Sequence, residues 1–196
     1  MTSNSRKTAF NLNSKVSGSL DLYNQVPYRI AIASNLLALD RDANVKHITH
    51  LDTRAIRVLL NIGSYGPINA ADIAYQTRLD PYSVTRAING LLKEELIQAS
   101  NDHTTSRSKF VELSEAGTPI YQNIANYMAK RCEDVLDGIS DDEQTLLMTV
   151  LEKIELNTER MLAENAQTLK DNGGTPTRDQ SEQIRWFKRT KAIEIK

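Results

Sequence analysis

The sequence predicts a mainly helical protein with one small β-hairpin, and three observations carry that prediction. Apolar residues recur at helical spacing through most of the chain, whereas only residues 96–100 and 109–113 read as strands. Aromatic residues make up only 6% of the chain, which suits helices better than a β-sandwich. A length of 196 residues predicts one compact domain with tails.

A long helix is expected within residues 18–48. Val26, Ile30 and Leu37 keep one face of this helix, with Ala33 between them. Pro27 stands either in the first turn or at a kink. Residues 1–17 before it are polar and are expected to form a disordered tail.

Three short helices are predicted next, because the same start signal occurs three times. Each signal combines an apolar residue, a polar N-cap and a second apolar residue that can close a hydrophobic staple. The three sets are Leu51, Asp52 and Ile56, then Ile68, Asn69 and Ile73, and finally Leu79, Asp80 and Val84. Asp72 adds a capping-box position to the second helix, and Pro81 suits the first position of the third.

The hairpin and two further helices complete the chain order. Residues 101–106 are polar and are expected to turn between the two strands. Ser114 is expected to open a helix that runs to about Asp134, and Ser140 with Glu143 predicts the capping box of a last long helix. That last helix carries an apolar stripe made of Leu147, Val150, Ile154 and Met161.

The second and third short helices are joined by the tight Thr77–Leu79 connection, which is the spacing of a helix-turn-helix. A hairpin directly after them predicts a winged helix-turn-helix over residues 49–117. The buried face of the third helix is expected to consist of Val84, Ile88, Leu91 and Leu92.

The other faces of that third helix carry side chains that can bind base edges and phosphates. Arg86 is the natural guanine reader and Asn89 a candidate adenine reader. The full set of DNA-binding candidates, including three on the hairpin, is Tyr82, Ser83, Thr85, Arg86, Asn89, Lys93, Thr104, Arg107 and Lys109. The alternative is a solvated helix face without function.

Two segments carry a family resemblance. DPYSVTRAINGLLKEELI, which begins at Asp80, and RSKFVELSEAG, which begins at Arg107, resemble the recognition helix and the wing of the MarR family of transcriptional regulators. The similarity in element order covers about residues 25–165. It implies a homodimer whose N- and C-terminal helices interlock, with each recognition helix in a major groove and each wing toward a minor groove.

Two positions depart from the family pattern. The wing usually carries an Asp, a variable residue and an Arg, but here Thr105, Ser106 and Arg107 stand at these places. Glu95 replaces a glycine that the family often has at the end of the recognition segment. The cation of the wing is therefore kept, whereas its carboxylate partner is absent.

A homodimer is also expected from physical reasoning. The helix in residues 18–48 and the stripe from Leu147 to Met161 each expose an apolar seam that a winged helix core cannot cover alone, so residues 18–48 and 118–170 are expected to be dimerisation segments. Two-fold symmetry predicts double-stranded DNA with a palindromic operator as the partner. Residues 118–170 carry ten acidic and five basic residues, which predicts a solvated face away from DNA.

The resemblance further implies a repressor that a phenolic or aryl-carboxylate effector releases from DNA. An anionic effector needs a cation, and aromatic side chains can stack on it or offer a hydroxyl group. The candidates are Tyr28, Arg29, His50, Arg54, Arg57 and Tyr65, with surface salt bridges as the alternative role. A winged helix dimer that binds another regulator instead of DNA is the rival function.

The sequence gives little support for a metal site, a reactive cysteine or an enzyme. His47 and His50 have no second pair of ligands, since His103 lies in the wing and Cys132 in a helix, so no metal and no cofactor are expected. Cys132 is expected to be a small buried side chain. The sequence lacks the common catalytic motifs and any apolar run long enough to span a membrane, which predicts a cytoplasmic protein without enzymatic activity.

The C-terminal segment, residues 171–196, is expected to be a linker up to residue 183, followed by a basic and aromatic tail. Residues 185–191 read RWFKRTK, which could pack across the dimer, bind nucleic acid or remain a free basic tail. Packing is favoured, because the aromatic pair and the preceding Ile184 would be poorly placed in solvent.

Overall fold

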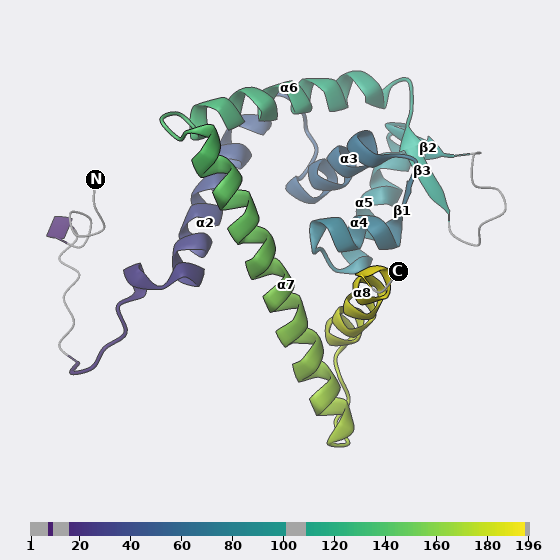
Figure 1. Ribbon diagram of the computed structural model, residues 1–196. Helices are drawn as coiled ribbons and strands as arrows, with labels where there is room; N and C mark the ends of the chain where they lie inside the picture. The colour runs from purple at the N-terminus through teal and green to yellow at the C-terminus, as the bar shows by residue number, and fades with distance from the viewer. Residues whose placement is uncertain (1–7, 10–15, 101–108, 195–196) are drawn as a thin grey trace. The chain divides into compact units, whose positions relative to one another are not determined.

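The computed structural model describes residues 8–9, 16–100 and 109–194 (Figure 1). By its internal contacts the chain divides into two compact units, Met1–Leu51 and Asp52–Lys196. The tail expected over residues 1–17 lies almost entirely outside the described residues. No helix within the described ranges combines the length and apolar character needed to cross a bilayer.

The first unit contains a short 3-10 helix, η1 (Leu22–Asn24), and the long helix α2 (Val26–Val45). Pro27 lies in the first turn of α2, where its missing N–H leaves no bond unmade, so the kink is not observed. Only Val45 of this helix is buried. Several large apolar residues of α2 are exposed in the single chain, namely Val26, Leu36, Leu37 and Leu39.

The second unit opens with the three short helices that the start signals predict: α3 (Thr53–Tyr65), α4 (Ala70–Thr77) and α5 (Pro81–Lys93). All three N-caps are confirmed. Asp52 accepts the N–H of Ala55 at 2.8 Å, and Asn69 accepts two backbone N–H groups at 3.0 Å each. These caps satisfy backbone donors that a helix start otherwise leaves unbonded.

A three-stranded antiparallel sheet with the order β1-β3-β2 closes the winged helix. The predicted strands are β2 (Ile97–Ala99) and β3 (Phe110–Leu113), paired with Ile97 opposite Leu113. The third strand, β1 (Ile68–Asn69), was not expected, because two residues give no periodicity. It pairs with β3 and places Ile68 opposite Val111, so both side chains are buried.

Three helices follow the sheet: α6 (Gly117–Val135), α7 (Asp141–Asp171) and α8 (Arg178–Glu194). The capping box of α7 is confirmed, since Ser140 and Glu143 bond each other's backbone N–H. Helix α6 starts close against the sheet, because a Cβ on Gly117 would stand 1.8 Å from the carbonyl oxygen of Leu96. Only glycine fits at this crossing.

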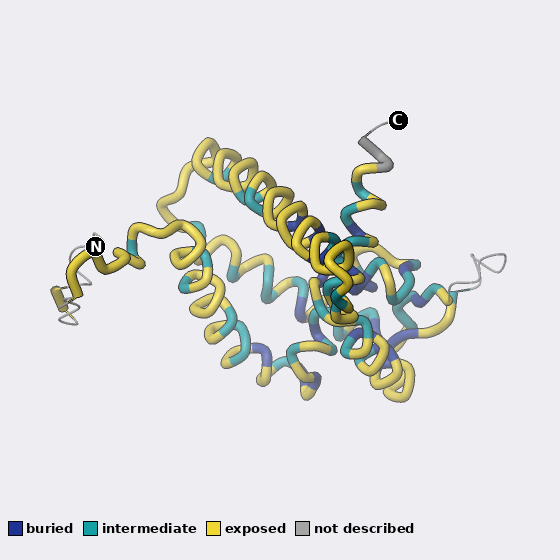
Figure 2. The backbone as a smooth tube through the Cα atoms, turned by 90° about the horizontal axis from the view of Figure 1, so that it is seen from below, coloured by how far each residue is buried: buried dark blue, intermediate teal, exposed yellow. Residues whose placement is uncertain are grey.

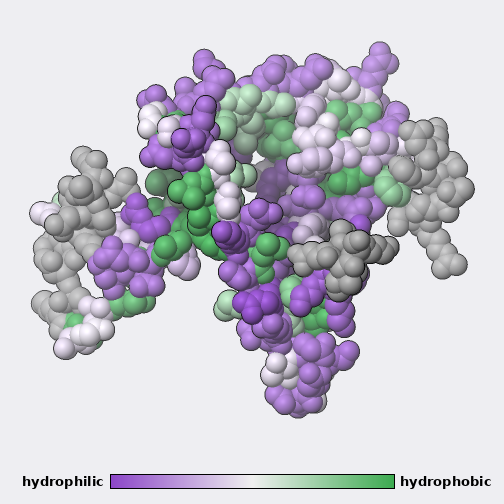
Figure 3. All heavy atoms as spheres, in the orientation of Figure 1, coloured by the Kyte–Doolittle hydropathy of each residue, from purple (hydrophilic) through white to green (hydrophobic). Residues whose placement is uncertain are grey.

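The buried residues concentrate in the winged helix (Figure 2). The core of α3, α4 and α5 includes Leu59, Ile62, Ile73 and Val84, each at most 1% exposed. Helix α7 is mostly exposed by contrast, and its C-terminal half presents a mainly hydrophilic surface (Figure 3). The single chain therefore forms its hydrophobic core in the winged helix and leaves most of α7 exposed.

Two expectations about the C-terminal segment need correction. The predicted linker up to residue 183 is shorter, because α8 already begins at Arg178. Thr177 caps this helix through its hydroxyl group, which accepts the N–H of Gln180 at 3.2 Å. The basic and aromatic tail was expected to pack across the dimer, whereas in the structure it packs within the chain: Trp186 is only 8% exposed and its ring lies 5.8 Å from that of Tyr75 in an edge contact.

The turn after α5 explains the family's preference for glycine there. Glu95 adopts a left-handed conformation with φ +57°. The N–H groups of Glu95 and Leu96 bond the carbonyl groups of Leu92 and Leu91, which is the Schellman arrangement. A glutamate in this conformation is strained, whereas glycine is not.

We expect Glu95→Gly to raise the free energy of unfolding by about 1 kcal/mol, because the strain at positive φ disappears. Urea unfolding followed by circular dichroism measures this change. Glu94→Gly is the matched control, since Glu94 has φ −86° and its replacement should lower the stability. A Glu95→Gly protein less stable than the wild type would contradict the strain.

Candidate nucleic-acid interface

Helix α5, which the sequence predicts to be the recognition helix, is oriented by its cap and its buried face. Asp80 accepts the N–H of Ser83 at 2.8 Å, and Pro81 occupies the first turn. Hydrogen bonds from Ser83 hold the pKa of the Asp80 carboxyl below its usual range, so this cap stays ionised at neutral pH. Val84, Ile88 and Leu91 are buried, which fixes the face that α5 turns to solvent.

The predicted base-contact residues of α5 lie mainly on that solvent face. Tyr82 is 67% exposed, and Ser83 is half-buried with its N–H committed to Asp80. The exposed members of the predicted set are Tyr82, Thr85, Arg86, Asn89 and Lys93. Their spacing of three or four residues forms one continuous row along the helix.

The wing is described in part. Lys109 is exposed immediately before β3, next to the strand pair. Gln98 of β2 donates to Glu112 of β3 at 3.0 Å across the two strands. The predicted contacts Thr104 and Arg107, together with Thr105, Ser106 and His103, lie outside the described residues.

Two side chains differ from their expected burial. Leu92 was expected on the buried face of α5 but is 38% exposed, because Leu91 already fills the core position of this last turn. Cys132 was expected to be buried but is exposed on α6. Only Gly117 and Ile124 of that helix are buried, so its C-terminal half does not enter the core.

The turn between α4 and α5 is built around Arg78, which the sequence offered only as a connecting residue. Arg78 adopts φ +53°, ψ +25°, and its guanidinium group lies 4.0 Å from the ring centroid of Tyr75. It also forms an ion pair with Glu159 of α7 and lies 5.7 Å from the ring centroid of Trp186. The geometry of the helix-turn-helix is thus tied to α7 and α8.

The effector candidates of the first unit lie on α2. The guanidinium group of Arg29 lies 5.5 Å from the ring centroid of Tyr23, which in turn makes an edge contact with Tyr28 at 6.3 Å. Arg29 and Tyr23 line an open hollow of about 380 Å³ together with Val26. Tyr23 was missed in the sequence because nothing in its spacing marks it. His50 is exposed after the end of α2.

The candidates of the second unit lie on α3. Arg54 and Tyr65 are exposed. Arg57 is half-buried and donates a hydrogen bond to the carbonyl oxygen of Thr77 at the end of α4. Arg57 therefore also holds the helix-turn-helix together.

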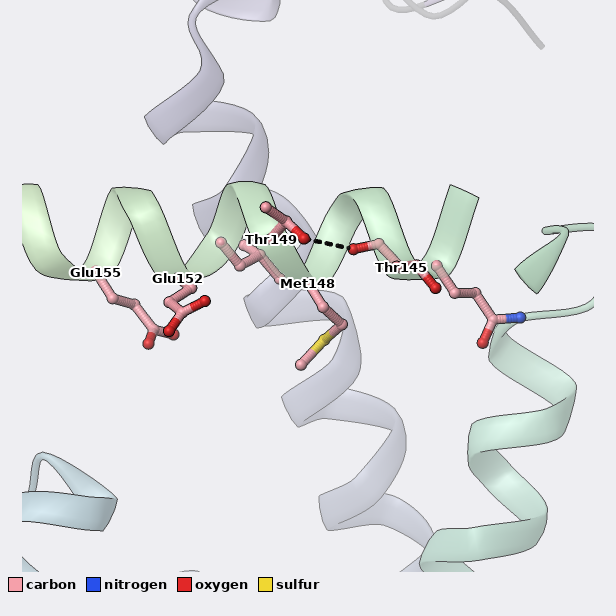
Figure 4. A pocket seen from close by; sticks show the side chains of 7 residues that line it. Thr145, Met148, Thr149, Glu152 and Glu155 are labelled. Atoms are coloured by element: carbon pink, nitrogen blue, oxygen red, sulfur yellow. Dashed lines mark hydrogen bonds between the residues drawn. The ribbon is translucent and has the colours of Figure 1, made fainter. Parts of the chain in front are cut away.

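Another hollow lies on α7 alone (Figure 4). It has a volume of about 610 Å³ and is lined partly by Met148, Glu152 and Glu155. Thr149 donates to the carbonyl oxygen of Thr145 at 3.0 Å, so its hydroxyl group is engaged along the helix. Its lining contains two carboxylates and no cation, which does not suit an anionic effector. No cluster of three metal-ligating side chains occurs within the described ranges.

The helix pair, the small sheet and the exposed row on α5 define a winged helix-turn-helix protein, a class that binds DNA. Residues 51–109 match the sequence model of the MarR family. The winged helix of this chain is therefore similar to the MarR family, whose proteins are transcriptional regulators.

Known proteins are similar to this chain. A Bacillus subtilis (strain 168) protein described as an uncharacterized HTH-type transcriptional regulator, YwhA, is 24% identical over 120 residues, which span 59% of this chain and 81% of the relative. The crystal structure of a MarR/EmrR family transcriptional regulator from Acinetobacter sp. ADP1 has a TM-score of 0.66 at 17% identity, covering 72% of this chain and 99% of the other.

A third similar structure contains a ligand. The PcaV transcriptional regulator from Streptomyces coelicolor, in complex with its natural ligand, has a TM-score of 0.55 at 13% identity and covers 70% of this chain and 96% of the other. At these identities the two structures support the fold of the chain.

We expect Arg86→Ala to weaken binding to a preferred duplex by about 1–3 kcal/mol, because the bidentate hydrogen bonds to a base edge disappear. Fluorescence anisotropy with that duplex and with single-base variants measures the effect. The Arg86→Ala protein should lose its preference for the original base at one base-pair position only. An equal loss on every sequence would instead assign Arg86 to the phosphate backbone.

Proposed function

We propose that this regulator is a homodimeric repressor that binds a palindromic operator. Each subunit places α5 in a major groove and its wing toward a minor groove, with half-sites about one helical turn, roughly 34 Å, apart. The observation that carries the proposal is the exposed row of base-reading and phosphate-binding side chains on α5.

Exposed apolar residues support the dimer. Helix α7 exposes Leu146, Leu147, Met148, Val150 and Met161 in the single chain, in addition to the exposed residues of α2. Apolar surface of this extent is typical of an interface. In this proposal residues 18–48 and 118–170 are dimerisation segments, and residues 49–117 are the DNA-binding segment.

We infer that an aromatic carboxylate is the effector and that it releases the repressor from DNA. The support is chemical and comes from each unit by itself: Arg29 lies beside the ring of Tyr23 in the first unit, and Arg54 is an exposed cation on α3 in the second. A protein of the same fold, PcaV, binds a natural ligand. Linkage requires the effector to bind the free protein more tightly than the DNA-bound protein, by the same factor by which it weakens DNA binding.

The test is the selection of bound duplexes from a random DNA pool, with and without a panel of substituted benzoates. We expect one enriched palindrome that is lost when one of the acids is present. Enrichment of a palindrome that no acid disturbs would reject the effector class but keep the repressor. No enrichment at low salt would favour a regulator that binds another protein.

Arg54→Ala should abolish the effect of the active benzoate on DNA release, because the carboxylate of the effector loses the cation that binds it. The affinity for the enriched duplex should stay within about twofold of the wild type, since Arg54 is not among the predicted DNA contacts. Anisotropy titrations of the duplex with and without the benzoate measure both quantities. Arg160→Ala is the control, since Arg160 is also an exposed arginine. Loss of DNA affinity together with the effector response would remove Arg54 from the effector site.

A further inference from the structure

Helix α8 is docked on the helix-turn-helix by specific contacts. Trp186 is buried against Tyr75 of α4, and the guanidinium group of Arg189 binds the carboxylate of Asp72 at 2.6 Å. Asp72 belongs to the first turn of α4. The segment is therefore a part of the DNA-binding unit.

The surface that α8 adds is basic. Five basic and three acidic residues lie in Arg178–Glu194. Three of the basic residues, Arg178, Arg185 and Arg189, line a groove of about 460 Å³. The side chains of Arg185 and Arg189 are 68% and 65% exposed.

The opposite wall of this groove belongs to the DNA-reading helices. It includes Ala70 and Ala71 at the start of α4 and Pro81 and Thr85 in the first turns of α5. In helix-turn-helix complexes the first helix crosses the DNA backbone, and the N-terminal residues of the recognition helix reach the base edges. The backbone next to the bases that α5 reads therefore passes close to this groove.

Both exposed arginines can still bind a phosphate. Arg185 pairs with Glu182 on its own helix at 2.5 Å, and Arg189 pairs with Asp72. Each of these pairs uses part of a guanidinium group that has five N–H donors, so donors remain for an incoming phosphate oxygen. The alanines of α4 leave room for the backbone of a duplex to approach.

We propose that Arg178, Arg185 and Arg189 bind phosphates of the DNA backbone beside the recognition helix, so that α8 extends the DNA interface beyond the winged helix. This inference rests on DNA binding by the regulator but not on the repressor role, the palindrome or the effector. Contacts to phosphates carry no sequence information, so they should strengthen binding to any duplex.

The decisive variant is the pair Arg178→Gln and Arg185→Gln in the full chain. It removes two charges, keeps a donor for Glu182 and leaves the Arg189–Asp72 ion pair intact. The probe is a labelled mixed-sequence duplex of roughly 30 base pairs, titrated at several salt concentrations. We expect the slope of log Kobs against log salt to become less negative by about 1 for each phosphate that the variant no longer binds, with roughly fivefold weaker binding per phosphate at low salt.

Three controls separate this effect from others. Lys130→Ala removes an exposed charge from α6, which lies on the other side of α3 from α8 (Figure 1), and should leave the slope unchanged. Arg185→Lys should keep a slope near the wild-type value, because the charge remains. Trp186 is the only tryptophan, so an unchanged emission maximum shows that α8 stays docked.

Two results would overturn the proposal. A slope equal to that of the wild type with α8 docked would mean that the helix does not meet DNA. Tighter binding of the variant would mean that α8 obstructs the duplex. If the emission of Trp186 shifts, Arg178→Gln alone is measured against Lys130→Ala, and an equal slope again overturns the proposal. A wild-type protein that binds no duplex at low salt would instead contradict DNA binding itself.

Discussion

The left-handed conformation of Arg78 sets the turn at which α4 and α5 of the helix-turn-helix meet. Its backbone is left-handed, which a non-glycine residue adopts only when its surroundings compensate for the strain. Here the side chain stacks on Tyr75 and pairs with Glu159, whose carboxylate is almost buried. Breaking this pair would leave a nearly buried charge without its partner, so the turn and the long helix α7 are held together.

Two further helices contact the same turn. Trp186 of α8 packs on the ring of Tyr75. Arg57 of α3 donates a hydrogen bond to the carbonyl oxygen of Thr77, the last residue of α4. Helices α3, α7 and α8 therefore all reach the short stretch of residues 75–78. Helix α5 therefore keeps its exposed row in one orientation, and a surface that is already ordered loses less entropy on binding a partner.

The local signals of the winged helix-turn-helix were readable because they depend on neighbours in the chain. The caps Asp52, Asn69 and Asp80 each bond N–H groups two or three residues away, and the buried face of α5 follows from helical spacing. Leu92 shows the limit of that spacing. A pattern cannot decide which of two adjacent leucines fills the core position of the last turn, because the partner surface decides it.

The sequence by itself determined where α3, α4, α5 and α7 begin and the spacing of the helix-turn-helix, since capping and periodicity are local properties. Only the tertiary structure decided that Ile68 pairs with Val111, that Arg78 binds Glu159 and that Trp186 packs on Tyr75. These contacts join residues that are far apart in the chain. Their formation depends on where the whole core places each surface, and no local pattern contains that information.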